Sequence, residues 1–172
     1  SEILFMHKQY GINTSSNVLG RNKQIVAVSR ILSFSFLGGS AGILSDLLLM
    51  NHYENFTQIL PILLISVCLI LFLATLFIKT KRIIYFFKCA LALLTICAFL
   101  GIYFHLKGKA DFKIEIDPTL KGWNLFLACI TGHSLPPVLA PASIILVALS
   151  GYAWALVNTY KSQLKNIYDH QK

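Results

Sequence analysis

Four long apolar segments alternate with polar segments along the chain. They cover residues 25–50, 57–78, 83–104 and 137–160. Each is long enough to cross the hydrocarbon layer of a bilayer, which takes about 20 helical residues. The pattern therefore predicts an all-α integral membrane protein with four transmembrane helices in an antiparallel bundle.

The two ends of the chain are polar. Residues 1–24 contain many turn-forming residues and predict a loosely ordered N-terminal arm, and residues 161–172 form a polar C-terminal tail. The first apolar segment exceeds the hydrophobic region of a signal peptide, which has about 7 to 15 residues. We therefore expect residues 25–160 to form a single membrane domain.

The longest polar segment between two spans is 105–136, which we call the cap. Residues 112–116 alternate apolar with charged side chains and predict a short extended segment. Asp117 followed by Pro118 is typical of a helix start, since an N-cap precedes a proline at the first helical position. We expect a helix over 118–131, ended by Gly132, that lies at the external interface of the membrane.

The last span begins at Pro137, which directly follows Pro136 in a double-proline break, and has Pro141 in its first turn. Together with Glu115, Pro118 and Trp123, Pro137 and Pro141 are the residues by which the cap would present an external surface to a partner. The sequence thus predicts an external cap made of a turn, an extended segment, an interfacial helix and a double-proline break.

Composition supports the membrane assignment. Hydrophobic residues make up 56% of the chain and charged residues 13%, against about 25% charged in soluble domains. The net charge of +8 does not indicate nucleic-acid binding, because the basic residues gather at the ends of the apolar segments and form no stripe with stacking aromatics. The four cysteines have no CxxC spacing and predict no disulfide framework.

The distribution of basic residues predicts the orientation. Nine Lys and Arg residues lie in the arm, the second loop and the tail, whereas four lie in the cap and none in the first loop. By the positive-inside rule both termini are cytoplasmic. This orientation brings a set of ligand-type residues to the external face: Asp46, His52, His105 and His133.

The first span is rich in small residues. Gly38 and Gly42 have the GxxxG spacing that allows a neighbouring helix to approach closely. Asp46 follows four residues later, on the same helix face. The carboxyl group is therefore expected to point toward a neighbouring helix and away from lipid.

A set of positions in the cap and last span follows a recognisable pattern: His105, Gly108, Phe112, Glu115, Pro118, Gly122, Trp123, Leu125, Phe126, Pro137, Leu139, Ala140 and Pro141. It resembles small four-helix bacterial membrane proteins of unassigned function. The chain departs from that pattern at Lys109 and His133. The resemblance implies a four-span protein of the bacterial inner membrane and supplies no activity.

These patterns favour a non-enzymatic multi-pass membrane protein, a subunit, assembly or interaction protein that lies in the lipid bilayer. Its cap and its glycine face would bind a membrane protein partner or a second copy. No cofactor and no catalytic residue is predicted, since adjacent His133 and Ser134 cannot aim at each other.

The alternative is an external metal site built from His52, His105, His133 and Asp46, whose side chains suit transition metals. A haem held by His52 and His105 is a variant of this hypothesis. Transport is a further class, but the four spans contain no internal repeat.

Overall fold

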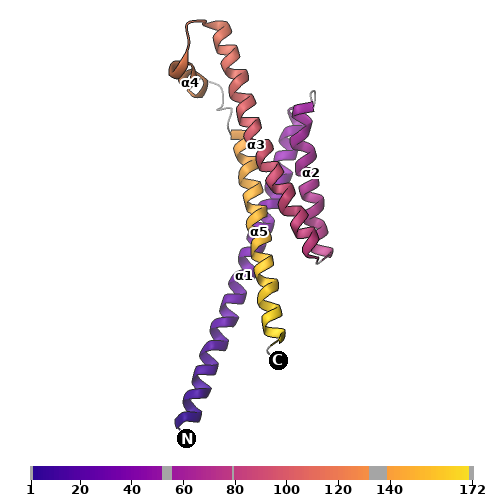
Figure 1. Ribbon diagram of the computed structural model, residues 1–172, viewed down its shortest axis with the longest axis vertical. Coiled ribbons are helices and arrows are strands. Elements are labelled where there is room, and N and C mark those ends of the chain that lie inside the picture. Colours follow the sequence, from indigo (N-terminus) through magenta and orange to yellow (C-terminus); the bar gives the residue numbers. More distant parts are fainter. Residues whose placement is uncertain (1, 52–55, 79, 132–138, 171–172) are drawn as a thin grey trace.

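The computed structural model describes the backbone of residues 2–51, 56–78, 80–131 and 139–170, and the side chains of residues 23–51, 56–78, 80–131 and 139–164. Within these ranges the chain forms five helices and no strand (Figure 1). They are α1 (Glu2–Leu49), α2 (Phe56–Phe77), α3 (Lys81–Ile116), α4 (Gly122–Ile130) and α5 (Leu139–His170).

Four of the helices contain segments that are long and apolar enough to cross a membrane. These segments are Lys23–Leu49, Phe56–Phe77, Lys81–Ile116 and Leu139–Leu164. The prediction of four apolar helices is confirmed. Their ends differ from the predicted spans mainly in α1, α3 and α5, each of which continues as a helix into a neighbouring polar segment.

The N-terminal arm is the first such difference. α1 begins at Glu2, so the segment predicted to be loosely ordered has a helical backbone. It contains no proline that would stop a helix, and each of its glycines costs only about 1 kcal/mol relative to alanine. A helix that is already nucleated in the first span can therefore extend through it. α5 likewise continues to His170, through most of the predicted tail.

The cap shows the second difference, because the predicted extended segment 112–116 is wrong. These residues form the last turns of α3. Phe112 and Ile116 are four residues apart, so they share one face of a helix just as well as one face of a strand. α3 has 36 residues, about 54 Å at 1.5 Å per residue. Its upper part projects past the ends of α2 and α5 (Figure 1).

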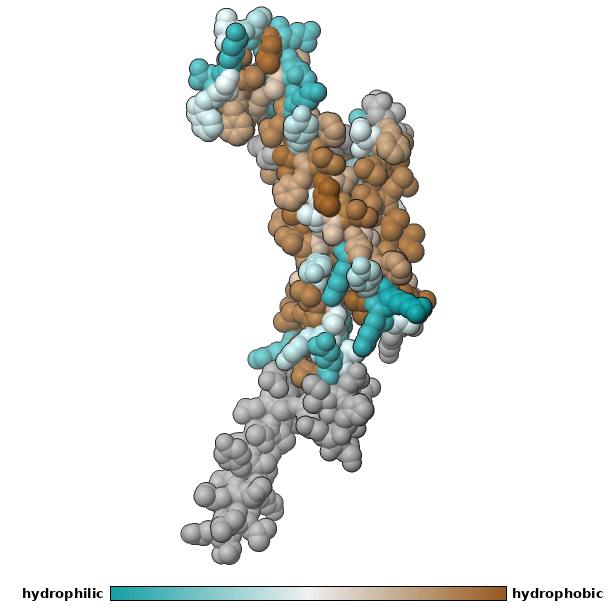
Figure 2. All heavy atoms as spheres, viewed as in Figure 1, coloured by the Kyte–Doolittle hydropathy of each residue, from teal (hydrophilic) through white to brown (hydrophobic). Residues whose placement is uncertain are grey.

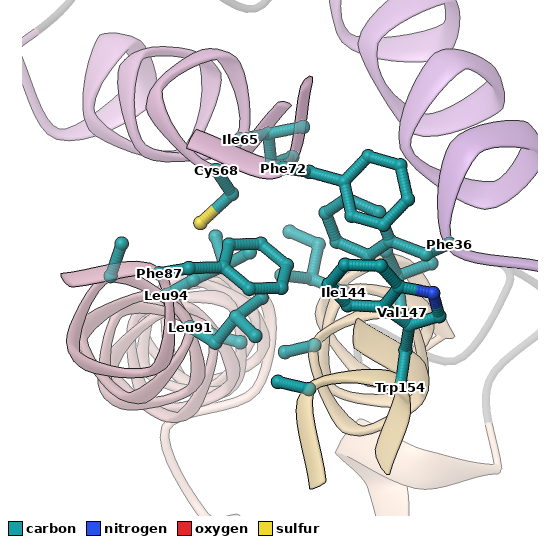
Figure 3. Close-up of a cluster of buried hydrophobic side chains, with 14 residues drawn as sticks. Phe36, Ile65, Cys68, Phe72, Phe87, Leu91, Leu94, Ile144, Val147 and Trp154 are labelled. Carbon is teal, nitrogen blue, oxygen red and sulfur yellow. The ribbon is translucent and has the colours of Figure 1, made fainter. Parts of the chain in front are cut away.

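The core lies where α1, α2, α3 and α5 meet. Phe36, Phe72, Phe87 and Trp154, one from each helix, are buried and point toward one another (Figure 3). The ring centroids of Phe36 and Phe72 lie 5.0 Å apart, and those of Phe72 and Trp154 lie 4.6 Å apart. Such tilted aromatic pairs contribute beyond their buried area.

Two glycines allow α1 and α5 to pack closely against each other. A Cβ atom on Gly39 would lie 2.5 Å from Val147 Cγ2, and one on Gly151 would lie 2.8 Å from Phe36 Cδ2. The same two helices share a hydrogen bond, in which Asn158 Nδ2 donates to Ser29 Oγ over 3.0 Å. Small residues and one polar pair thus hold α1 against α5, as is common between helices in lipid.

The outside of the bundle is apolar. Large side chains such as Phe34, Ile70 and Leu146 are exposed on three different helices, and brown surface covers the middle of the molecule (Figure 2). A soluble monomer rarely exposes an apolar surface of this extent. The surface fits a bundle whose solvent is lipid.

Candidate functional site

The small residues of α1 form an open face on the outside of the bundle. We call this the open α1 face, and it consists of Ser35, Gly38, Ala41, Gly42, Ser45 and Asp46, all of them exposed. A Cβ atom on Gly38 or Gly42 would meet nothing within 4 Å. The predicted close approach of a neighbouring helix to this pair therefore does not occur within the described part of the chain. The neighbouring residue Gly39 makes the close contact inside the bundle, with Val147 of α5.

Sequence analysis missed Gly39 although a signal for it exists. It lies between Phe36 and Ile43 in the i, i+3, i+7 spacing of one helix face, and both of those residues belong to the core or pack against it. Gly38 is turned by about 100° from Gly39 around the helix axis. Although they are adjacent in the sequence, Gly39 therefore lies on the packed side of α1 and Gly38 on its open side.

Asp46 lies at the C-terminal end of the open α1 face. Its backbone carbonyl accepts a 2.9 Å hydrogen bond from the Met50 backbone N–H, so the carboxyl group is about one turn from the end of α1. Its side chain is exposed. Carboxylates inside spans normally face a bundle interior or water, because facing lipid is costly. Asp46 is therefore the residue of this face that most needs a polar partner.

Within the cap, α3 and α4 are joined by a turn around Asp117. Asp117 Oδ1 accepts a hydrogen bond from the Thr119 hydroxyl at 2.6 Å and one from the Thr119 backbone N–H at 3.0 Å. α4 starts only at Gly122, whose φ is +55°. Asp117 and Pro118 consequently form a turn and do not start the helix, because the aspartate side chain closes the turn locally.

The hydrogen bonds from Thr119 hold the pKa of Asp117 below its ordinary value, the hydroxyl contributing most. A lowered pKa means that the turn's stability is present above the ordinary pKa, about 3.9. It is lost as the pH falls through the lower folded pKa.

We expect Thr119→Val to raise the pKa of Asp117 part of the way to its ordinary value, because only the backbone donor remains. A carbon-detected NMR titration of the Asp117 carboxyl measures this. Thr131→Val removes a comparable exposed hydroxyl, which donates to Leu127 O, and should leave that pKa unchanged. Equal pKa values in wild type and Thr119→Val would refute the assignment.

α4 packs against the projecting end of α3. Cys129 is buried, whereas Trp123 and Phe126 are exposed and stacked, with their ring centroids 5.1 Å apart.

The amine of Lys109 on α3 is buried and has no hydrogen-bond partner among the described residues. Such an amine is costly.

The predicted metal ligands are only partly within the described residues. Asp46 and His105 are described and exposed, whereas His52 and His133 lie outside them. Within the described ranges no group of three or more His, Cys, Asp or Glu side chains could hold a metal ion. The metal and haem hypotheses therefore stay predictions.

The remaining cap residues lie in different surroundings. Glu115, Pro118 and Trp123 are exposed, with Glu115 in the last turn of α3 and Trp123 at the start of α4. Pro141 is buried in α5, where its ring lies 3.6 Å from the position of a Cβ atom on Gly101. Pro137 lies outside the described residues. Pro141 thus helps to join α5 to α3 and offers no external surface.

No known family identifies this chain. Family models, curated proteins and solved structures give no match. The resemblance to small four-helix bacterial membrane proteins stays a prediction. The functional argument therefore rests on the surfaces of the bundle.

Proposed function

We propose that the chain is a non-enzymatic, multi-pass membrane subunit that binds a transmembrane helix of a partner protein along the open α1 face. The observation that carries the proposal is the placement of Gly38 and Gly42, which are open to the outside while Gly39 and Gly151 make the packed contacts. In this proposal the protein lies in a bacterial inner membrane with both termini in the cytoplasm.

The physics of helix association in lipid supports an occupant for this face. Lipid tails are as apolar as leucine side chains, so association comes from close van der Waals contact and interhelical hydrogen bonds. A row of glycine, alanine and serine offers both, since it brings two backbones together and exposes hydroxyl groups. The face has this composition over about three turns, from Ser35 to Asp46.

Asp46 specifies the chemistry of the partner. It is an acceptor at the outer end of the face, so the matching helix should carry a donor such as serine, asparagine or lysine at the same depth. Between the depth of that donor and the depth of Ser35, the matching helix should have small residues. The exposed Trp123 and Phe126 of the cap would contact the part of the partner outside the membrane.

Paired substitutions test this function. A tagged chain carrying Gly38→Leu and Gly42→Leu should lose at least about tenfold of its co-purified partner in lipid nanodiscs, an association loss of about 1.4 kcal/mol. Ala92→Leu is the matched control, because Ala92 is an exposed small residue on α3. It should retain the partner.

The amount of folded chain is measured in parallel and should be equal in all three proteins. Undiminished co-purification in the double glycine variant would overturn the proposal. A complex that contains only two copies of this chain would identify the partner as a second copy.

A further inference from the structure

The apolar segments of α1 (Lys23–Leu49) and α5 (Leu139–Leu164) form an open apolar groove between them, close to Lys23 and Lys161. It has a volume of about 350 Å³ and is lined by Gln24, Ile25 and Val28 of α1 and by Leu156, Val157 and Tyr160 of α5. The two helices diverge below this level (Figure 1). The groove is separate from the open α1 face, which lies farther along α1.

The lining of the groove is apolar, and polar groups lie on residues next to it. Ile25, Val28, Leu156 and Val157 supply aliphatic walls, whereas Gln24 and Tyr160 carry an amide and a phenol. Lys23 precedes Gln24 and Lys161 follows Tyr160, and both lysines are exposed. One apolar wall and two ammonium groups therefore occur at the same level of the molecule.

The charge around the groove is one-sided. No Asp or Glu occurs in residues 3–45 of α1 or in residues 139–168 of α5. The two lysines consequently have no carboxylate within their own helices near this level. A ligand with an anionic group would be attracted there, and a cationic one repelled.

The charge beside the groove favours an anionic lipid as its occupant. Such a lipid offers an acyl chain to the apolar wall and a phosphate to the two ammonium groups. A single acyl chain is narrow and flexible. Basic pockets between transmembrane helices at the cytoplasmic side are a known way to bind anionic lipid headgroups.

We propose that this groove binds an anionic phospholipid, with one acyl chain against Val28 and Leu156 and the phosphate beside Lys23 and Lys161. The site does not depend on partner binding by the open α1 face. A bound lipid would fix α1 and α5 relative to each other at the level of Val28 and Leu156, and would anchor both helices to the leaflet that holds the lipid.

The test measures lipid retained by the full chain in native mass spectrometry. Detergent-purified protein is mixed with equal amounts of dioleoyl phosphatidylglycerol and dioleoyl phosphatidylcholine, and separately with inorganic phosphate. We expect about tenfold more phosphatidylglycerol than phosphatidylcholine on the wild type. Phosphate alone should not be retained, because it lacks the acyl chain.

Two variants locate the site. The double substitution Lys23→Gln with Lys161→Gln should reduce the preference to near equality, and Val28→Trp should reduce retention of both lipids by filling the groove. Lys81→Gln with Arg82→Gln is the matched control, since both residues are exposed at the α2–α3 connection. It should keep the preference.

Equal retention of the two lipids by the wild type would overturn the proposal. So would a preference that survives in the Lys23 and Lys161 double variant. Retention of phosphate alone to the same extent as phosphatidylglycerol would also contradict it, because the site would then recognise only a free anion.

Discussion

Replacing Phe36 by alanine is expected to lower the free energy of unfolding by about 3 kcal/mol, at the lower end of the range for Phe→Ala in cores. Phe36 is fully buried and its ring contacts Phe72 and Phe87, so truncation leaves a cavity between three helices. The cost comes from lost packing, because a bilayer gives little transfer term between lipid and core.

The measurement uses Trp154, which belongs to the same buried aromatic cluster; its ring centroid lies 4.6 Å from that of Phe72. Trp123→Phe leaves Trp154 as the only tryptophan. Its fluorescence during denaturation by dodecyl sulfate then reports on the core. Phe34→Ala is the matched control, since Phe34 lies on the same helix and is 74% exposed.

The control should change the unfolding free energy by about 0.5 kcal/mol or less. If Phe34→Ala and Phe36→Ala destabilise the protein equally, the assignment of the packed and outer sides of α1 is wrong.

Replacing Gly151 by valine should have an effect of similar size, about 3 kcal/mol, the upper end for overpacked cores. Even a Cβ atom at Gly151 would lie 2.8 Å from Phe36 Cδ2, 2.9 Å from Phe36 Cε2 and 3.2 Å from Leu91 Cδ1. The Phe36 ring cannot turn away, because Phe72 and Phe87 enclose it. Valine would therefore push α5 away from α1 and α3.

The matched control is Gly38→Val, since a Cβ atom at Gly38 meets nothing within 4 Å. Size-exclusion chromatography of fluorescent fusions measures the folded fraction. We expect Gly151→Val to lose most of its monodisperse peak and Gly38→Val to keep it. A normal peak for Gly151→Val would contradict the close contact between these helices.

The number of apolar helices was predictable because lipid imposes a simple rule. A spanning segment must satisfy its own backbone hydrogen bonds and present about 20 apolar residues. Helix ends outside the spans are not bound by this rule. The alternation of apolar and charged residues at 112–116 fits a strand or a helix. In the structure α3 runs without a break through Gly108 to Ile116 and includes this segment.

The side of α1 that faces the core was harder to predict. In a soluble helix the polar side marks the outside, but in lipid both sides are apolar. The spacing of Gly38 and Gly42 correctly placed them together with Asp46 on one face. The burial of Phe36 and the contact of Gly39 with Val147 show which face is packed. The metal hypothesis depended on His52 and His133, which lie outside the described residues, and on His105, which lies within α3.

The most direct test of the proposed interaction is site-specific photocross-linking from Ala41, at the centre of the open α1 face. Benzoylphenylalanine at Ala41 in living cells should form one discrete adduct with a membrane protein, and Gly38→Leu with Gly42→Leu should abolish it. The same probe at Leu146, which is 68% exposed on α5, should give no such adduct. An Ala41 probe that reacts only with lipid would contradict the account.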